Sequence, residues 1–330
     1  MSRNSSLPPS DYRGRLAPSP TGYLHIGHAR TFWTACQRAI AAAGTLVMRM
    51  EDLDPDRSRA EYADAALNDL RWLGIHWQEG PDLSSPDLSS PDHGGPYAPY
   101  EQSRRMAFYL DAWSKLQKGG FLFPCRCSRK DLEAALNAPH ESISPGTVEA
   151  QGHNEPGNGE QEPLDDEPIY PGTCRRSENN FPLSPNSPAC NIAEPGCFNW
   201  RFRVPAGEVI EFVDLNLGPQ RFVAGTDFGD FVVWRRDGVP SYQLACVADD
   251  AAMRITEVVR GEDLLKSTAR QILLYRALSL TPPAWFHCRL VADSSGRRLA
   301  KRHDALSLRA LRLRGFTPEQ ILSGALPMET

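Results

Sequence analysis

Two histidines and a glycine in the segment His25-Ile26-Gly27-His28 are the residues whose types and spacing best suit chemistry. Residues 17–22 are turn-forming and residues 28–43 are rich in helix formers, which predicts that Gly27 and His28 lie at a helix N-terminus. Backbone N–H groups at such an end attract anions, and glycine lets a phosphate approach closely. His25 and His28 can donate hydrogen bonds to oxygens that gain charge during displacement at phosphorus. The motif therefore predicts a place to hold a triphosphate.

Four residues alone fit a helix start with incidental histidines equally well. A second element changes that balance, because the basic run Arg298-Leu299-Ala300-Lys301-Arg302 follows the turn-like residues 293–296 and predicts a cationic loop. An early H-I-G-H motif followed by a late loop similar to K-M-S-K-S resembles the paired signatures of class I aminoacyl-tRNA synthetases. Taken by itself, the loop is also compatible with a solvated basic turn.

Longer segments resemble the catalytic domain of glutamyl-tRNA synthetases, in the same order from about residue 13 to residue 302. These segments are Arg15–Arg30, Arg49–Asp54, Ser241–Asp250 and Val259–Leu265. Only residues 303–330 follow the lysine loop, too few for the helical anticodon-binding region of full-length glutamyl-tRNA synthetases. The chain therefore resembles the glutamyl-Q tRNA(Asp) synthetase family, which consists of the catalytic core alone.

The resemblance implies that a carboxylate of L-glutamate attacks the α-phosphorus of ATP, which gives glutamyl-adenylate and pyrophosphate without a protein nucleophile. Catalysis then consists of aligning two anions and neutralising the charge on the transferred group, with Mg²⁺ assisting. The implied catalytic residues are His25, His28 and Lys301, and the implied ATP-binding residues are Gly27, His28, Arg298 and Lys301. Arg298 and Ala300 stand where the family motif usually has lysine and serine, so the loop keeps a charge and loses a hydroxyl donor.

Glutamate selectivity needs cations for two carboxylates and an acceptor for the ammonium group. The resemblance implies glutamate binding by Arg15, Ser19, Glu51, Tyr242 and Arg260, and a guanidinium fork suits a carboxylate. Each residue also has an ordinary structural explanation. Arg260 and Glu51 could form a structural ion pair, and Tyr242 could pack in the core.

A cysteine cluster predicts a metal site. Cys125-Arg126-Cys127 and, further on, Tyr170 and Cys174 supply three thiols and a phenol, and soft ligands favour Zn²⁺. In the resembling family a C-x-C…Y-x-x-x-C set holds structural zinc, although about forty residues between the two halves here exceed the usual loop. Cys190, Cys197, His140 and His153 are therefore possible substitute ligands, and free cytosolic cysteines beside a packed tyrosine remain an alternative.

Strand and helix patterns alternate along the chain, which predicts an α/β fold with a doubly wound parallel sheet, interrupted by an inserted zinc-binding subdomain. Strands are expected at residues 46–50, 208–213 and 230–234, and helices at 61–73, 101–118 and 267–278, the last begun by a Ser267 cap. The expected divisions are a disordered tail (1–12), the first half of the catalytic domain (13–122), the inserted subdomain (123–222), the second half (223–292), and the lysine loop with a short helical segment (293–330). Residues 138–168 and 177–197 have the composition of mobile insertions.

Composition favours a cytoplasmic enzyme. The chain has 330 residues, 41% of them hydrophobic, with no apolar run long enough to cross a bilayer and no apolar secretory signal. A reducing compartment makes metal ligands or free thiols the expected state of the 8 cysteines. The net charge of −5 argues against indiscriminate nucleic-acid binding, so RNA contacts should depend on local basic patches.

The resemblance implies transfer of the glutamyl group to queuosine in the anticodon of tRNA(Asp), rather than to a terminal adenosine. The arginines from Arg289 to Arg314 could contact phosphates. Arg309, Arg312 and Arg314 alternate with leucines, however, which also fits the exposed face of a C-terminal helix. Two other functions stay open: a shortened glutamyl-tRNA synthetase that charges the 3′ end, and a non-enzymatic, zinc-stabilised RNA-binding paralogue.

Overall fold

The fold begins with a parallel strand pair connected through a helix. The computed structural model describes residues 11–81, 95–128, 131, 169–175, 194–290 and 307–323. Strand β1 (Arg13–Leu16) pairs in parallel with β2 (Thr45–Met48), and helix α1 (Ile26–Ala41) makes the crossover. The strand expected at 46–50 and the helix expected at 28–43 are both present, shifted by one or two residues.

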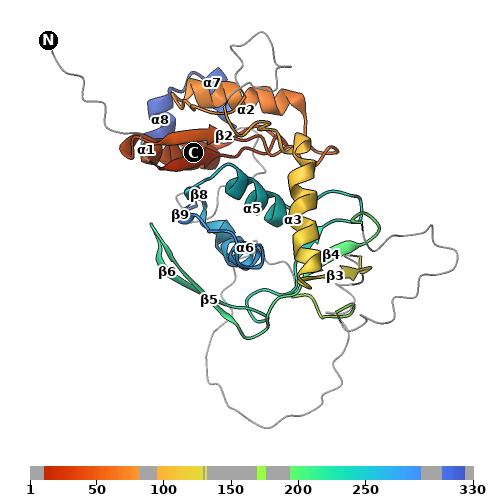
Figure 1. Cartoon of the computed structure of the whole chain (residues 1–330). Helices are drawn as coiled ribbons and strands as arrows, with labels where there is room; N and C mark the ends of the chain where they lie inside the picture. The colour runs from red at the N-terminus through yellow and green to blue at the C-terminus, as the bar shows by residue number, and fades with distance from the viewer. Residues whose placement is uncertain are drawn as a thin grey trace, which may run out of the picture.

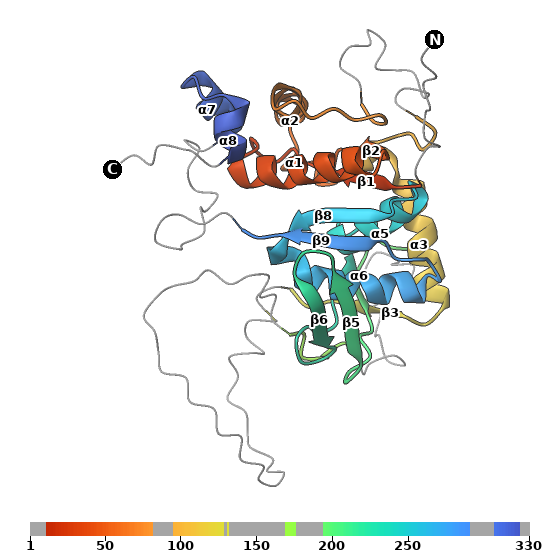
Figure 2. The same ribbon diagram turned by 90° about the vertical axis from the view of Figure 1, so that its left-hand side faces the viewer.

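A second parallel pair lies beside the first. Strand β8 (Glu257–Gly261) pairs in parallel with β9 (Ala284–Cys288), and helix α6 (Leu265–Ala277) connects them after the short turn η2 (Glu262–Leu264). The backbone N–H of Thr256 donates to the carbonyl of Arg13 at 2.9 Å, which joins the start of β8 to β1. Figure 2 shows β8 and β9 directly beneath β1 and β2.

Helices cover both faces of these strands. Successive side chains of a strand point to opposite faces, and on β8 the neighbours Val258 and Val259 enter two different hydrophobic clusters. The Val258 cluster includes residues of α6, whereas the Val259 cluster includes residues of α1. Figure 2 shows α1 and α6 on opposite sides of β8 and β9. The expected α/β class with a parallel sheet is confirmed.

Antiparallel strands complete the sheets. Strands β5 (Val209–Asp214) and β6 (Gly218–Val223) form a hairpin, and β5 also pairs with β9 in parallel. A separate three-stranded sheet has the order β3-β4-β7, formed by Leu122–Cys125, Asn199–Phe202 and Val232–Trp234. The hairpin therefore extends the sheet that carries β8, and β3 and β4 belong to the separate sheet. The domain boundaries at 122 and 222 stay predictions.

Helices are also present in the segments 61–73 and 101–118, where the sequence predicted them. Helix α2 (Ala60–Trp72) lies where residues 61–73 predicted it, whereas the expected helix 101–118 is a turn, η1 (Gln102–Arg104), followed by α3 (Met106–Lys118). Figure 1 shows α3 beside α5 (Tyr242–Ala252), with β3 and β4 near its lower end.

The predicted serine cap of α6 is wrong. The helix begins two residues before Ser267, and its N-cap residue, Leu264, makes no side-chain cap bond. Ser267 is buried inside the helix, where its hydroxyl accepts a hydrogen bond from Nε2 of Gln243 at 2.9 Å. The Ser267 hydroxyl therefore bonds a residue of another helix instead of capping its own helix.

The C-terminal segment packs against the first helices. Helix α7 (Leu308–Leu313) buries Leu308 and Leu311 in the cluster beneath α1, while Leu313 remains 81% exposed. Helix α8 (Pro318–Ser323) adds Ile321 to the same cluster. No helix among the described residues is long and apolar enough to span a membrane.

Candidate active site

The first histidine caps the helix that the motif predicted. His25 is the N-cap of α1, where its Nδ1 accepts the backbone N–H of Gly27 at 3.1 Å. The backbone N–H of His25 in turn donates to Nδ1 of His28 at 3.2 Å. The expectation that Gly27 and His28 lie at the helix N-terminus is confirmed, although one of the amides expected to face an anion is bonded to His25 instead.

The contact of Gly27 with a side chain explains why a glycine stands there. A Cβ atom on Gly27 would lie 2.9 Å from Cε1 and 3.1 Å from Nδ1 of His25, closer than normal packing allows. The imidazole rings of His25 and His28 are stacked, with centroids 3.8 Å apart. Since both Nδ1 atoms accept, a neutral ring at either position carries its proton on Nε2. The cap therefore fixes the tautomer in which Nε2 is a donor.

The segment after the lysine loop returns to this helix start. His25 and Ser307 form an antiparallel bridge, and the backbone N–H of Leu308 donates to the carbonyl of Leu24 at 2.7 Å. Ser307 also caps α7 by accepting the N–H of Ala310. Lys301 and Arg298 lie outside the described residues, so their roles stay predictions, while the chain six residues after Lys301 lies beside His25.

Four of the five expected glutamate-binding residues belong to one group of connected side chains, in which Arg15 and Arg260 are each 4% exposed and Tyr242 is 37% exposed. Arg15 on β1 lies 3.6 Å from Asp250, measured from Nε to Oδ1. Arg49 bonds the same Asp250 oxygen at 2.6 Å and donates to Glu51 Oε1 at 3.1 Å. Arg15 and Glu51 are therefore connected through Asp250 and Arg49.

Helix α5 connects this group to the other two residues. Cys246 donates its thiol hydrogen to Glu51 Oε1 at 3.5 Å, and Tyr242 lies one helical turn earlier on the same helix. The Tyr242 hydroxyl accepts from Nη1 of Arg260 at 3.3 Å. Glu51 pairs with Arg49, so the proposed structural ion pair between Arg260 and Glu51 is wrong.

The fifth residue, Ser19, lies in an exposed turn next to the group. The backbone N–H of Glu51 donates to the carbonyl of Pro18 at 3.0 Å, which holds this turn at the end of β2. The carbonyl of Ser19 accepts the N–H of Thr21. The turn that contains Ser19 therefore lies next to Glu51. The role of Ser19 in binding glutamate stays a prediction.

Buried charges beneath the group balance one another. Burial lowers the pKa of Arg49, but the carboxylates of Asp250, Asp249 and Glu51 outweigh it and hold that pKa well above the usual value. Burial, followed by the charge of Glu51, raises the pKa of the Cys246 thiol. Arg49 is thus a fixed cation that orients Glu51, and Cys246 is a neutral thiol.

Sequence reasoning assigned no role to Arg49, Asp249, Asp250 or Cys246. Charged residues inside otherwise apolar segments were the available signal, since Arg49 lies within the strand segment 46–50 and the two aspartates end an apolar helix. Asp249 holds Arg105 at 2.6 Å and accepts from Tyr109 at 2.8 Å, which fixes α3 against α5.

Arg260 is buried, with 4% of its surface exposed, and each guanidinium nitrogen has a neutral partner. Nε donates to Nε2 of His287 at 3.2 Å, Nη2 donates to the Thr268 hydroxyl at 2.6 Å, and Nη1 donates to Tyr242. Within the described part of the chain, no carboxylate forms a salt bridge with Arg260. A buried cation without a paired anion is suited to binding a carboxylate.

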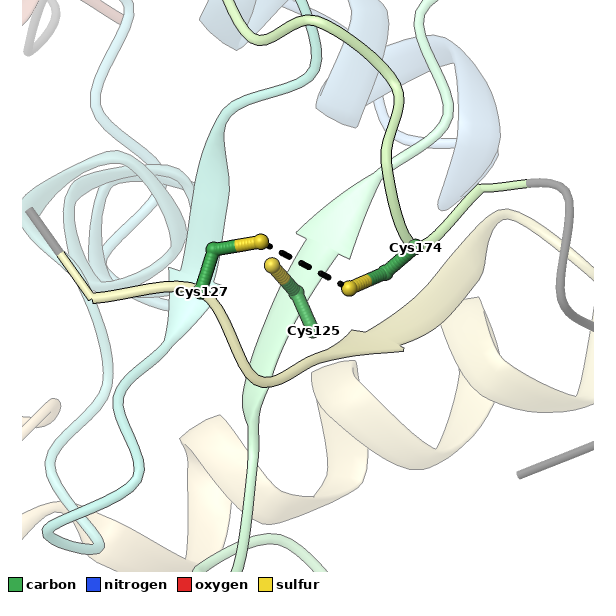
Figure 3. A group of neighbouring side chains, drawn as sticks. All are labelled: Cys125, Cys127 and Cys174. Atoms are coloured by element: carbon green, nitrogen blue, oxygen red, sulfur yellow. Dashed lines mark hydrogen bonds between the residues drawn. The ribbon is translucent and has the colours of Figure 1, made fainter. Parts of the chain in front are cut away.

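The expected metal ligands are brought together despite their long separation in sequence. The thiol sulfurs of Cys125, Cys127 and Cys174 all lie within 4.8 Å of one another (Figure 3). The Tyr170 hydroxyl lies 3.4 Å from the sulfur of Cys125 and 3.8 Å from that of Cys127, and the two sulfurs of Cys127 and Cys174 are 3.6 Å apart. Zn–S bonds of about 2.3 Å place sulfurs roughly 3.8 Å apart around a tetrahedral ion. The donor set therefore fits Zn²⁺.

The pKa values of two of these thiols shift in opposite directions. Burial and the nearby Cys125 raise the pKa of Cys127 to about 12. Burial also raises the pKa of Cys174, but hydrogen bonds from Tyr170 and a backbone N–H outweigh it and lower that pKa. Among the substitute ligands, Cys197 is disulfide-bonded, so the expectation of free thiols is wrong there. His140, His153 and Cys190 lie outside the described residues.

The described arginines near the C-terminus interact with aromatic residues. Arg309 donates to the Tyr23 hydroxyl at 2.8 Å, and its guanidinium lies 5.1 Å from the Tyr23 ring centroid. Arg312 lies over the Trp72 ring at 5.4 Å. Arg309 of α7 therefore packs against Tyr23, which precedes α1, and Arg312 of α7 packs against Trp72 of α2.

Comparison with known proteins identifies the family. The family model described as "tRNA synthetases class I (E and Q), catalytic domain" matches residues 12–161 and 171–328. The chain belongs to this family. It is 46% identical over 309 residues to a glutamyl-Q tRNA(Asp) synthetase from Symbiobacterium thermophilum, with 94% of this chain and 84% of that protein covered. It is 43% identical over 316 residues to one from Nitratidesulfovibrio vulgaris, with 96% and 85% covered.

A solved structure supports the same fold. The crystal structure of a glutamate tRNA ligase from Elizabethkingia meningosepticum in complex with its amino acid matches with a TM-score of 0.64 and 26% sequence identity. The match covers 93% of this chain and 53% of that ligase, so the chain spans about half of its length. The fold is that of a class I synthetase catalytic domain, and the chain is a ligase-type enzyme of that family.

Proposed function

We propose that this chain activates L-glutamate with ATP and transfers the glutamyl group to queuosine in the anticodon of tRNA(Asp). Two relatives at 46% and 43% identity carry the name glutamyl-Q tRNA(Asp) synthetase and align over most of their own length. The observation that carries the activation step is the buried Arg260, whose bonded partners are neutral. Arg260 thus has no carboxylate bonded to it among the described residues, and a carboxylate of glutamate can take that place.

In the first step, a glutamate carboxylate oxygen attacks the α-phosphorus and the bond to the β-phosphate oxygen breaks, releasing pyrophosphate. Nε2–H groups of His25 and His28 donate to oxygens that gain negative charge, and Lys301 with Mg²⁺ neutralises the leaving pyrophosphate. The fixed Nδ1 acceptors hold each imidazole in the donor tautomer before the substrate binds. The protein thus aligns the two substrates and stabilises the negative charge that develops, and it supplies no nucleophile.

Glutamate is held by opposite charges at its two ends. Arg260 and Tyr242 face the side-chain carboxylate, Glu51 accepts from the ammonium group, and Arg15 and Ser19 complete the site. The Arg49–Glu51 bond supports the assignment of Glu51, because it orients the carboxylate through Oε1 and leaves the second oxygen for the ammonium group.

A structural zinc ion bound by Cys125, Cys127, Tyr170 and Cys174 is part of the proposal. When bound, Zn²⁺ ties β3 to the segment containing Tyr170. Arg201 supports this arrangement, because its guanidinium lies 4.2 Å from the Tyr170 ring centroid and Nη1 donates to the carbonyl of Asp230. We place the reaction in the cytoplasm, where the tRNA substrate resides.

The test is transfer of labelled glutamate to tRNA(Asp) that contains or lacks queuosine. The proposal requires ATP-dependent label in the queuosine-containing RNA, unaffected by removal of the 3′ terminal adenosine. Label that depends on an intact 3′ end and ignores queuosine would support the alternative, a glutamate tRNA ligase activity like that named for the structural relative. Absence of glutamate-dependent pyrophosphate exchange would leave only a non-catalytic RNA-binding role.

A further inference from the structure

The strand register places a histidine and an aspartate behind Arg260. Arg260 on β8 is the Cα partner of His287 on β9, and β9 also pairs with β5, which ends at Asp214. Three adjacent strands therefore supply Arg260, His287 and Asp214 in a row. His287 and Asp214 are 0% and 2% exposed, respectively, so solvent does not compete for their hydrogen bonds.

The hydrogen bonds determine where the imidazole proton lies. Arg260 Nε can only donate, so Nε2 of His287 accepts at 3.2 Å. Nδ1 of His287 then carries the proton and donates to Oδ2 of Asp214 at 2.6 Å. Backbone N–H groups of Asn216 and Leu217 also donate to Asp214 Oδ1, at 3.0 and 2.8 Å. The carboxylate is thus held rigidly and fixes the Nδ1–H tautomer.

The imidazole also separates two opposite charges. A carboxylate in direct contact with Arg260 would form a bidentate pair and occupy the guanidinium edge. Asp214 instead reaches Arg260 only through the neutral ring of His287, while Thr268 and Tyr242 supply the other acceptors. The guanidinium is oriented on every nitrogen and keeps its charge uncompensated by a bonded carboxylate.

We propose that His287 and Asp214 are positioning residues for Arg260, which fix its orientation through a neutral acceptor and thereby preserve its charge for the side-chain carboxylate of glutamate. The inference rests on the proposed function, because it assigns Arg260 to the substrate. Discrimination between glutamate and glutamine then depends on Asp214 and His287 as well as on Arg260 itself. Glutamine offers no negative charge to such a guanidinium.

Two substitutions test the row. Asp214→Asn keeps the shape of the side chain, but its amide N–H groups donate to Nδ1 and favour the Nε2–H tautomer, which opposes Arg260 with a donor. His287→Leu removes the acceptor altogether. For both variants we expect the KM for glutamate in pyrophosphate exchange to rise about tenfold or more, with the KM for ATP and kcat changing much less, since ground-state binding is what is lost.

A conservative variant and a matched control separate positioning from folding. His287→Gln can accept from Arg260 through its amide oxygen and donate to Asp214 through its nitrogen, so its KM for glutamate should lie between the wild-type and His287→Leu values. Asp230→Asn removes another buried carboxylate, one that accepts from the N–H of Val204 in a different part of the fold. It should lower thermal stability without moving the KM for glutamate.

Imidazole ¹⁵N chemical shifts give a readout that does not require turnover. The His287 signals, assigned by their loss in His287→Leu, should show a neutral ring protonated at Nδ1, and Asp214→Asn should move the proton to Nε2. Unchanged glutamate KM values in both Asp214→Asn and His287→Leu, with wild-type exchange activity present, would overturn the inference. Wild-type protein that shows no glutamate-dependent exchange would overturn the proposed function instead, and the Nδ1–H signal would still establish the geometry of the row.

Discussion

His25 and Ser307 form an antiparallel bridge, although Ser307 comes 282 positions after His25 in the chain. The bridge anchors the segment that follows the lysine loop to the N-terminus of α1. The chain five residues after the basic run 298–302 therefore lies at the N-terminus of α1, beside the other motif that the sequence suggested as its partner.

Two substitutions at His25 separate helix capping from catalysis. Asparagine is among the best N-cap residues and can accept the N–H of Gly27, but it cannot reproduce the imidazole Nε2–H donor. We expect His25→Asn to retain thermal stability and to lower the rate of adenylate formation by about 10²-fold. His25→Ala should lose the same activity and also about 1 kcal/mol of stability.

The measurements are pyrophosphate exchange and thermal unfolding, with His76→Ala as a control because His76 is exposed and lies outside both motifs. Near wild-type exchange in His25→Asn would show that capping, rather than proton donation, is the contribution of His25.

Gly27→Ala tests the contact between the glycine and the imidazole. The added methyl group lies 2.9 Å from Cε1 of His25, so the ring must move and the stacked pair must separate. Alanine is the better helix former by about 1 kcal/mol, which offsets part of the damage to the cap. We expect little change in unfolding temperature and a loss of about tenfold or more in pyrophosphate exchange.

Gly22→Ala is the matched control, since nothing lies within 4 Å of a Cβ atom there. Equal activities in the two alanine variants would contradict the steric role of Gly27.

Cysteine substitutions test the zinc site. Cys174→Ala removes one of three clustered thiols and should reduce bound zinc from about one ion per chain to a small fraction, with a lower unfolding temperature. Cys36→Ala alters another free cysteine, which lies on the buried face of α1, and should leave the zinc content unchanged. Elemental analysis of both purified variants decides, and full zinc content in Cys174→Ala would exclude Cys174 as a ligand.

Local patterns predicted the elements around the first motif well. The switch from turn residues to helix formers placed α1, and the apolar segment at residues 46–50 placed β2, because both depend on neighbours in sequence. Ser267 shows where such reasoning fails, since its hydroxyl bonds Gln243 on another helix.

The site was less accessible to pattern reasoning. The family resemblance supplied Arg15, Glu51, Tyr242 and Arg260 as a set, and the structure joins them through charges that no motif marked. His287 follows two aromatic residues in β9 and gives no local signal. Its meaning depends on Asp214, which lies 73 residues away and is brought near by strand pairing. Such non-local pairings cannot be inferred from spacing along the chain.

Asp69 on α2 predicts an unusual pH dependence of stability. The residue is 4% exposed and its Oδ2 has no hydrogen-bond partner. Burial raises its pKa to about 6, and the charges of Arg312 and Arg309 on α7 only partly oppose the rise. In the unfolded chain the same carboxyl has a pKa of about 3.9. The folded state therefore binds the proton more tightly, and the penalty of ionising Asp69 develops as the pH rises from about 4 to about 6.

Asp69→Asn removes the ionisation and should stabilise the protein at pH 7.5 by about 1–3 kcal/mol, with little effect at pH 4, where the carboxyl is protonated in the folded state. Asp64→Asn is the matched control, because Asp64 is exposed on the same helix. Thermal unfolding of the three proteins between pH 4 and pH 8 measures the difference. An Asp69→Asn variant no more stable than the wild type at pH 7.5 would contradict this prediction. The attraction of Asp69 to the arginines of α7 would then outweigh the cost of its burial, and the carboxylate would help to hold α7 against α2.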